Sequence, residues 1–405
     1  MSRKASFAAA LSLALIATAC GSPLAAPHLV PVDTAVALTL QAITAEATPA
    51  PSETPVPLPT AAPDVLAHSL YFLNQDGNGL WQIFRLAVDG HTTQQITFEP
   101  ISVDAYDVSP VDGGIAYITN NQLYMVDAAG AGRRLLIDGG PVDDNNRWTN
   151  SLAAPVFSPD GQTLAYTHGG LTLMNLSTGA ENRVLLNQID TSAGFPIVGQ
   201  LFAPNTYSAD GARLLINIGF YEGGTFGFYS PSNNALVRFE RAEGGNVCCH
   251  LNWIPDGSGV YITSPTLGMF ESGLYYADAA TGNVTTLLPG SAPDGTYNFA
   301  DAAQVGPDNK LYFFFNNLPE IPGSGHTPLY LVRSDPDGVT GRTQLFVDAF
   351  QNINEVLWAD DASLAVVVMA ANPDEYSGGE AHAVYPDGRA SIVLVPHASD
   401  LRWGP

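Results

Sequence analysis

The chain has 405 residues, enough for one large all-β domain or two ordinary domains, and its charged residues make up 13%, about half the usual share. Its formal net charge is −24. Such a surface repels phosphate backbones and anionic headgroups, so the charge argues against nucleic acid and leaves cations, basic proteins and neutral glycans as partners.

Residues 1–19 have the pattern of an export signal. Ser2-Arg3-Lys4 is a basic start, and Ala5 to Ala19 is an apolar run too short to span a membrane comfortably. The following Cys20 makes the segment resemble a bacterial lipoprotein signal, in which that cysteine is lipidated and becomes the mature N-terminus. The usual Leu three places before the cysteine is Ala17 here. The alternative is a plain secretory signal cleaved near Ala19. No later apolar run is long enough for a transmembrane helix.

Residues 20–67 are rich in Pro, Ala and Thr and poor in aromatic residues. Segments such as Thr54-Pro55-Val56-Pro57 favour extended polyproline II structure. We therefore expect a disordered, semi-rigid tether that separates the folded domain from the membrane. Within it, residues 36–45 could form a brief helix or strand, or no stable structure.

Residues 156–186 predict four short strands joined by tight turns. The turns are Ser158-Pro159-Asp160-Gly161, Gly169-Gly170 and Ser177-Thr178-Gly179, and apolar runs flank each of them. A single unit of this kind cannot bury both of its faces. It needs copies of itself on either side, and the sequence from residue 68 onward contains them.

The Ser-Pro-Asp-Gly-like turn recurs about every 45 to 53 residues, at positions 109–113, 158–161, 208–211, 254–257, 306–309 and 359–362. A bulky apolar residue precedes each turn, as an inner strand between neighbouring sheets requires; these residues are Val108, Phe157, Tyr207, Trp253, Val305 and Trp358. A repeat of this length with four strands is typical of a propeller blade.

The two ends of the repeat region predict how the ring closes. Residues 70–97 contain three strands and lack the first, whereas residues 400–403, ending in Trp403, look like a first strand with nothing after it. The last strand should therefore complete the first blade and leave no free sheet edge. The prediction is an all-β, seven-bladed β-propeller over residues 68–405, although six or eight blades also fit the pattern.

The segments FSPDGQTLAY (Phe157 to Tyr166) and QLYMVDAAGAGRRLL (Gln122 to Leu136) resemble the WD40-like repeat of TolB-type propellers, which also occurs in prolyl-oligopeptidase-type propellers. The resemblance covers about residues 68–405 and implies the architecture more than an activity. Residues 21–67 are no substitute for TolB's N-terminal α/β domain, and seven blades are counted here rather than six. The chain differs from the peptidases in having no Gly-x-Ser-x-Gly motif.

Cys248-Cys249-His250 is the most unusual local feature. Adjacent cysteines outside the cytoplasm can oxidise to a vicinal disulfide, and these lead into the inner strand that ends at Trp253. They could form a rigid ligand platform at one mouth of the central channel, or a buried or purely structural pair. The scattered histidines give no metal motif.

Polar residues near the starts of inner strands should surround the same mouth. They are Asp104, Asp107, Asn205, His250, Asn252, Asp301, Asn354, Glu355, Asp400 and Arg402. They could hold a polar ligand or Ca²⁺, or simply line a watery channel. Their spacing selects no catalytic pair, and no cofactor is expected.

Several loops could also carry recognition. The loop from Asp143 to Trp148 could contact a partner, or it could be solvated with Trp148 packed on its own blade. Asn74 to Gly79 resembles a calcium loop, but Arg85 occupies the position that needs Glu, so we expect a hairpin turn. Longer insertions at 220–225, 264–272, 316–327 and 371–380 should lengthen one face.

The leading hypothesis is a monomeric, membrane-anchored extracytoplasmic propeller that binds a protein, peptide or glycan. It contacts the membrane only through its lipid anchor. One alternative is an enzyme of the glycan lyase or hydrolase kind with its site at the channel mouth. A TolB-like envelope assembly factor is the other.

Overall fold

The computed structural model of the chain describes residues 64–192, 194–220, 223–244, 247–267, 270–322 and 325–405. The predicted signal peptide, Cys20 and residues 20–63 of the predicted tether lie outside the described residues.

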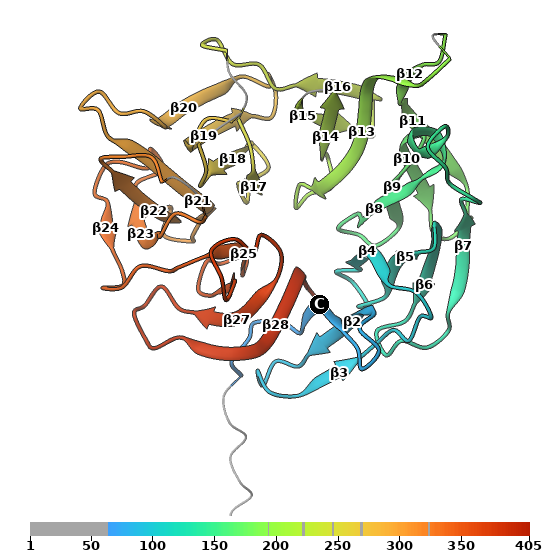
Figure 1. Cartoon of the computed structure of the whole chain (residues 1–405), viewed down its shortest axis with the longest axis horizontal. Helices are drawn as coiled ribbons and strands as arrows, with labels where there is room; N and C mark the ends of the chain where they lie inside the picture. Colours follow the sequence, from blue (N-terminus) through green and yellow to red (C-terminus); the bar gives the residue numbers. More distant parts are fainter. Residues whose placement is uncertain (1–63, 193, 221–222, 245–246, 268–269, 323–324) are drawn as a thin grey trace, which may run out of the picture. The chain divides into compact units, whose positions relative to one another are not determined.

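The described residues form seven antiparallel blades arranged in a ring (Figure 1). The first three blades follow one another from the start of the ring. Blade 1 consists of the end of β28 (Ile392–Trp403) with β1 (Leu70–Gln75), β2 (Trp81–Leu86) and β3 (Thr93–Gln95). Blade 2 consists of β4 (Val103–Val108), β5 (Ile115–Thr119), β6 (Gln122–Val126) and β7 (Arg134–Asp138). Blade 3 consists of β8 (Leu152–Phe157), β9 (Thr163–His168), β10 (Gly170–Asn175) and β11 (Glu181–Leu186).

The remaining blades repeat this order, with one extra strand in blade 4. Blade 4 consists of β12 (Gln188–Asp190), β13 (Ile197–Tyr207), β14 (Leu214–Phe220), β15 (Gly223–Ser230) and β16 (Ala235–Arg238). Blade 5 consists of β17 (His250–Trp253), β18 (Gly259–Ser264), β19 (Gly273–Asp278) and β20 (Val284–Pro289). Blade 6 consists of β21 (Tyr297–Val305), β22 (Leu311–Leu318), β23 (Tyr330–Ser334) and β24 (Thr343–Gln344). Blade 7 consists of β25 (Ile353–Trp358), β26 (Ala365–Met369), β27 (Gly379–Val384) and the start of β28.

The C-terminal strand β28 closes the ring, as predicted. Its first part pairs with β27, where Ala383 lies opposite Ile392. Its last part pairs with β1, where Leu70 lies opposite Trp403. One strand therefore belongs to two blades, and the predicted count of seven is confirmed.

The repeated Ser-x-Asp-Gly turns connect the first and second strands of the blades. In blade 3, the Ser158 hydroxyl donates to Asp160 Oδ1 at 2.6 Å and the Gln162 N–H donates to the same oxygen at 3.0 Å. Gly161 has a φ of +66°, a conformation that a residue with a Cβ adopts only with strain. The Ser, Asp and Gly residues of the turn thus determine its backbone conformation.

The hydrophobic core lies between the blades. One cluster joins Ile118 of blade 2 to Phe157 and Tyr166 of blade 3, and the other junctions have equivalent clusters. The bulky residues predicted to precede the turns fill these positions: Phe157 and Trp358, for example, are each 5% exposed. Every blade therefore buries both faces against its neighbours.

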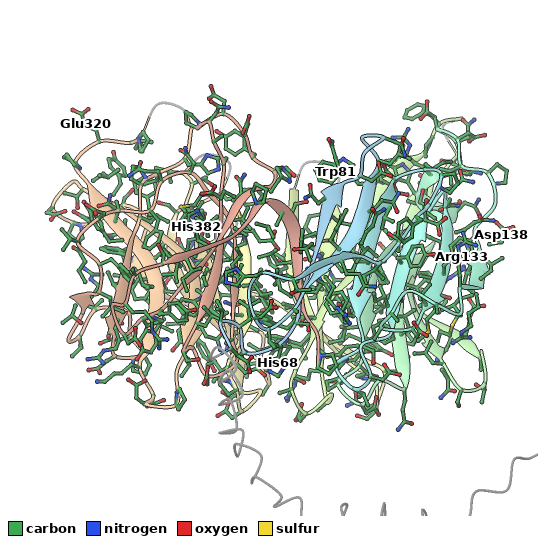
Figure 2. All side chains as sticks on the ribbon, turned by 90° about the horizontal axis from the view of Figure 1, so that it is seen from below. His68, Trp81, Arg133, Asp138, Glu320 and His382 are labelled. Carbon is green, nitrogen blue, oxygen red and sulfur yellow. A yellow bond between two sulfur atoms is a disulfide. The ribbon has the colours of Figure 1, made fainter. Side chains whose placement is uncertain are left out.

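The ring has two different faces. The turns between first and second strands and between third and fourth strands lie on one, which we call the turn face. The connections between blades and between second and third strands lie on the other, the loop face. Figure 2 shows His68 toward the turn face and Trp81 toward the loop face.

The described chain begins on the turn face. The Val65 and Leu66 N–H groups both donate to the Val88 carbonyl, at 2.9 and 3.0 Å, and the Tyr385 hydroxyl donates to the Val65 carbonyl at 3.0 Å. Leu66 is buried in the core shared by blades 1 and 7. Packing therefore begins at Val65, before the first strand.

The loop face carries irregular segments. Among the described residues, 265–267, 270–272, 319–322, 325–329 and 370–378 lie between second and third strands there. The expected loop at 220–225 is shorter than predicted, since β14 and β15 pair as far as Phe220 and Gly223. The connection before blade 3 includes α2 (Arg147–Asn150), which is the only helix among the described residues. Within that part of the chain, no helix is both long and apolar enough to cross a membrane.

Candidate functional site

Seven inner strands surround the central channel: β4, β8, β13, β17, β21, β25 and the end of β28 (Figure 1). Six of them contain a β-bulge, in which one or two residues have no partner in the next strand. Asp104, Asn205, Asn354 and Asp400 are among these bulged residues. Bulges redirect side chains and often occur near binding sites. Four of the sequence-predicted channel residues therefore owe their position to a local irregularity of the strand.

Three of the bulges contain a residue with left-handed backbone geometry. Ala154, Ala302 and Asp400 have φ values of +49°, +48° and +53°. A non-glycine residue in this region costs about 1 to 2 kcal/mol. The packing of the ring must offset that cost, so the bulges are a consequence of blade assembly.

The outer side of each inner strand is paired with its own blade, but its channel side has no strand partner. Unpaired backbone groups in a partly buried place are costly. A hydrogen bond that uses a side chain satisfies backbone groups across each of the seven junctions. Written from donor to acceptor, these bonds are Tyr106 to the Asp400 carbonyl (2.5 Å), Phe157 N–H to Asp107 (2.7 Å), Thr167 to the Phe202 carbonyl (3.3 Å), Trp253 to the Thr206 carbonyl (3.3 Å), Asn252 to the Ala303 carbonyl (2.9 Å), Trp358 to the Ala302 carbonyl (2.6 Å) and Leu401 N–H to Glu355 (2.6 Å).

Asp107, Glu355, Asp400 and Arg402 form the main charged cluster, which lies where blades 7, 1 and 2 meet. Arg402 Nη2 contacts Asp400 at 2.8 Å, and Arg402 Nε contacts Asp107 at 3.4 Å. Glu355 joins the cluster through the Leu401 N–H. One guanidinium thus stands among three carboxylates, and the cluster carries a net negative charge when all of them are ionised.

Burial determines the protonation of this cluster. It raises the pKa of the Asp107 carboxyl to about 6, against the opposing effects of Arg402 and the Phe157 N–H. It also raises the pKa of Glu355, while the Leu401 N–H lowers it. The surrounding carboxylates raise the pKa of Arg402 further above its usual value, which outweighs desolvation. Near pH 6, Asp107 is therefore close to its titration point.

His250 and Asp301 form a second pair at the junction of blades 5 and 6. His250 Nδ1 contacts Asp301 Oδ1, and the Asp301 side chain is only 1% exposed. The Asp301 carboxylate raises the pKa of His250 despite its burial. The preceding Cys248 and Cys249 are joined by a disulfide, with Cys248 buried and Cys249 exposed. The disulfide thus lies next to the pair, near the loop-face end of β17.

The other predicted channel residues are not part of these clusters. Asp104 and Asn205 are exposed, and partial burial raises the pKa of Asp104. Asn354 donates to the Gly378 carbonyl at 2.6 Å and accepts from His326 at 2.7 Å, if His326 carries its proton on Nε2. Asn354 therefore organises a loop of the loop face. The predicted hairpin at Asn74 to Gly79 forms a turn in which Asp76 accepts from the Asn78 and Leu80 N–H groups.

The channel contains two overlapping cavities of about 610 and 540 Å³. The first is lined by Tyr106, Asp107, Asp400 and Arg402 together with Pro155 and Pro204. The second is lined by Leu251, Trp253 and Trp403 together with polar residues such as Asn252 and Asp360. The charged cluster therefore lies in the first cavity, whereas the second has a mixed lining. Among the residues that the structure describes, no group of three or more His, Cys, Asp or Glu side chains is placed to hold a metal ion.

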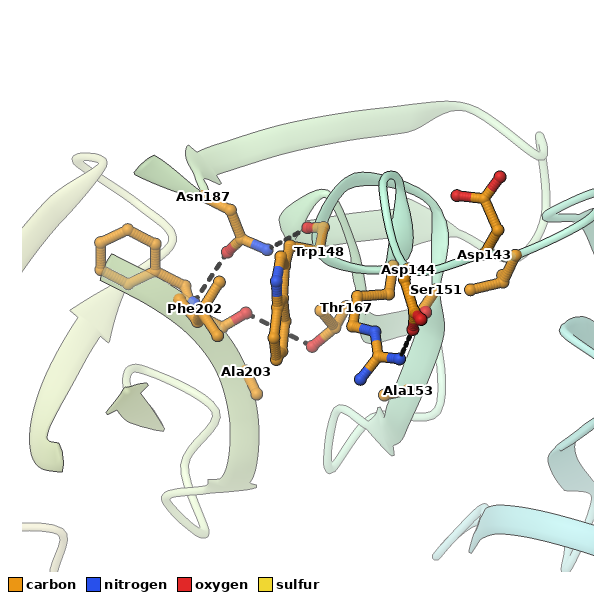
Figure 3. A pocket seen from close by; sticks show the side chains of 12 residues that line it. Asp143, Asp144, Trp148, Ser151, Ala153, Thr167, Asn187, Phe202 and Ala203 are labelled. Atoms are coloured by element: carbon orange, nitrogen blue, oxygen red, sulfur yellow. Dashed lines mark hydrogen bonds and ion pairs between the residues drawn. The ribbon is translucent and has the colours of Figure 1, made fainter. Parts of the chain in front are cut away.

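A third cavity, of about 530 Å³, opens on the loop face between blades 3 and 4 (Figure 3). The loop that contains α2 supplies Asp143, Asp144 and Trp148, and the inner strands supply Ala153 and Ala203. The side chain of Asn187 bridges the two blades: it donates to the Trp148 carbonyl at 2.8 Å and accepts from the Phe202 N–H at 2.9 Å. We call this cavity the Trp148 pocket.

Sequence reasoning placed the loop of Asp143 to Trp148 among the candidates but missed its partners. The sequence gives no signal that Asn187 would cross to the next blade. It also does not show that residues 188–200 would form the β12–β13 hairpin, because that segment has no Asn-Gly or Asp-Gly turn. Tyr106 was missed because an aromatic residue in an inner strand is usually interpreted as part of the hydrophobic core.

The pKa of Asp107 predicts a pH dependence of stability. The unfolded carboxyl titrates near 3.8 and the folded one near 6, so the folded state binds the proton more tightly. The stabilising contribution of this group is therefore complete below about pH 4 and is lost as the pH rises through 6. The loss amounts to about 3 kcal/mol at most. In Asp107→Asn, we expect the free energy of unfolding, measured in urea, to fall less between pH 4 and 7 than in the unmodified chain.

Asp89→Asn is a control for the sign of this effect. Hydrogen bonds from Thr92 and His91 lower the pKa of the exposed Asp89 to about 2. Its contribution is present above about pH 4 and is lost only as the pH falls toward 2, so its substitution should leave the range from pH 4 to 7 nearly unchanged. Equal pH profiles for the unmodified chain and Asp107→Asn would contradict the assignment.

The sequence matches no family model and no curated protein. Among solved structures, it is similar to a puromycin-hydrolysing peptidase from Mycobacterium tuberculosis, with 14% identity over 82% of this chain and 52% of that one, at a TM-score of 0.55. It is also similar to an oligogalacturonate lyase in complex with manganese, with 12% identity over 80% of this chain and 84% of the lyase chain, at a TM-score of 0.50. TolB from Acinetobacter baumannii shares 15% identity over 82% of this chain and 81% of the TolB chain, at a TM-score of 0.41. Identities this low show the fold alone, and at that level the chain is a β-propeller.

Proposed function

We propose that this protein is a non-catalytic binding module, anchored outside the cytoplasm through a lipidated Cys20, that holds a protein, peptide or glycan on its loop face. The observation that carries the proposal is the division of tasks between the two parts of the propeller. Charged groups in the channel connect the blades, whereas the open cavity on the loop face is built by segments that depart from the repeat.

The hydrogen bonds of the channel carboxylates support a structural role for them. Asp107 accepts the Phe157 N–H of the next blade, and Glu355 accepts the Leu401 N–H of the closing strand. Both carboxylates therefore already serve the junctions between neighbouring blades.

The direction in which the chain enters the ring supports the choice of face. Residues 64–66 are fixed on the turn face, between blades 1 and 7. An anchor upstream of them would connect to that face. The loop face, with its long connections and the Trp148 pocket, would then be available to an extracytoplasmic ligand.

One observation favours an enzyme as a second candidate. Asp107 has a pKa of about 6 and lies beside Arg402 in a cavity of about 610 Å³. A carboxyl near its titration point at working pH is suited to general acid–base catalysis. Under this alternative, the channel would act on a neutral or cationic substrate, since its cluster has three carboxylates and one guanidinium.

A single experiment distinguishes the two candidates. The full-length chain, solubilised in detergent, is applied to arrays of glycans and peptides, and each bound ligand is then incubated with the protein and analysed by mass spectrometry. We expect retention on the array and unchanged ligand mass. Cleavage of a ligand by the unmodified chain but not by Asp107→Asn would establish the enzyme instead, and the absence of any bound ligand would overturn the binding function.

The anchor is tested separately. Because the acyl chains would be attached to the Cys20 sulfur, Cys20→Ala should release the protein from the membrane fraction into the soluble fraction of cells. The measurement is an immunoblot of fractionated cells. A Cys248→Ala/Cys249→Ala double variant controls for loss of cysteine in general and should stay with the membrane. Retention of Cys20→Ala in the membrane fraction would refute lipidation.

A further inference from the structure

We propose that the Trp148 pocket binds a neutral sugar unit of a glycan, with the sugar ring packed on the Trp148 indole. This inference rests on the proposed binding function and makes it specific in place and in chemistry. The pocket volume of about 530 Å³ lies within the range of about 300 to 1,000 Å³ typical of small-ligand sites.

The lining combines apolar side chains with a charged group. The Arg147 guanidinium lies over one face of the Trp148 indole, 5.8 Å from the ring centroid, so a sugar ring would pack on the other face. The apolar part consists of Val142, Trp148, Ala153, Leu201 and Ala203, and the charged part consists of Asp143, Asp144 and Arg147. Figure 3 shows the Trp148 indole between the Asn187 side and the Asp144 side of the pocket. A sugar has the same division, with C–H groups on its ring faces and hydroxyl groups around its rim. The faces of an indole carry negative charge density, which favours contact with such C–H groups.

The polar groups that remain available match hydroxyl groups. Arg147 pairs with Asp144 through Nη2, which leaves its other N–H groups and the second carboxylate oxygen of Asp144 with no partner among the described residues. The Trp148 indole N–H likewise has no acceptor within that part of the chain. A hydroxyl both donates and accepts, so two neighbouring hydroxyls can bridge a carboxylate and a guanidinium.

The backbone of the pocket argues against a peptide. Peptides that bind in extended form gain affinity from main-chain hydrogen bonds to an exposed strand edge. Here the Phe202 N–H donates to Asn187, and the Phe202 carbonyl accepts from Thr167. The Trp148 carbonyl accepts from Asn187. These main-chain groups at the pocket are already satisfied, so recognition must use side chains.

Charge argues against an anionic ligand. Asp143 and Asp144 oppose the single Arg147 in the pocket, and the whole chain carries a formal charge of −24. A uronate or a phosphorylated sugar would be repelled at this site and by the surface around it. The neutral sugar is therefore the ligand class that fits both the lining and its charge.

The test uses cellopentaose, maltopentaose and mannopentaose as neutral probes and tri-galacturonate as an anionic probe, with affinities measured by isothermal titration calorimetry on the full chain. At least one neutral probe should bind, and tri-galacturonate should bind more weakly than that probe. Trp148→Ala should reduce the affinity about tenfold or more, since it removes the aromatic surface. Trp148→Phe keeps an aromatic ring but loses the indole N–H. Its affinity should lie between that of Trp148→Ala and that of the unmodified chain.

Two features make the substitutions interpretable. The bonds of Asn187 use the main-chain carbonyl of residue 148 and the N–H of Phe202, so Trp148→Ala leaves the link between the blades intact. Phe195→Ala is the matched control: Phe195 is an aromatic residue 61% exposed in the connection between β12 and β13, is not part of the pocket lining, and should leave the affinity unchanged.

The outcomes also separate this inference from the proposed function. If Trp148→Ala binds a neutral probe as tightly as the unmodified chain, the pocket assignment is wrong, but the binding function stands. Stronger binding of tri-galacturonate would overturn the ligand class. If no neutral probe binds while a peptide on the array does, the inference fails and the binding function again stands. If neither glycans nor peptides bind, both fail.

Discussion

The structure depends on how the free edge of each inner strand is satisfied. A propeller blade pairs its strands with one another and leaves the channel side of its first strand without a partner. In this chain, a hydrogen bond involving a side chain crosses every one of the seven junctions. Each such bond contributes only about 1 kcal/mol net, but an unsatisfied buried group would cost more. The bonds therefore stabilise the contacts between neighbouring blades.

This constraint explains why the residues of the channel look like an active site and why we assign most of them a structural role. Carboxylates, indoles and amides gather there because they can reach backbone groups of the next blade. Trp253, Trp358 and Trp403 repeat the same indole-to-carbonyl bond in three blades, which is the behaviour of a repeated structural element. The Trp148 pocket is built by segments that depart from the repeat. Its walls come from the α2 loop and from the unusually long strand β13 of blade 4.

The sequence was sufficient to predict the architecture because the repeat is local. The Ser-Pro-Asp-Gly turn at residues 158–161, the bulky residue before it and the unmatched strand at Trp403 each report on a few neighbouring residues, and together they imply a closed ring. The partners of Asp107 and Glu355 could not be predicted. They depend on one-residue bulges and on contacts about 50 residues apart, and no local pattern marks either feature. The role of Asn187 in the Trp148 pocket could not be predicted either, because its partners are also distant in the sequence.

The central claim is that side chains of one blade satisfy the inner-strand backbone of its neighbour, and amide hydrogen exchange tests it most directly. In the unmodified chain, the Phe157 and Leu401 N–H groups should exchange as slowly as amides paired within the blades. Asp107→Ala should accelerate exchange at Phe157 and leave Leu401 protected, and Glu355→Ala should do the reverse. Fast exchange of both amides in the unmodified chain, or protection that survives both substitutions, would contradict the account.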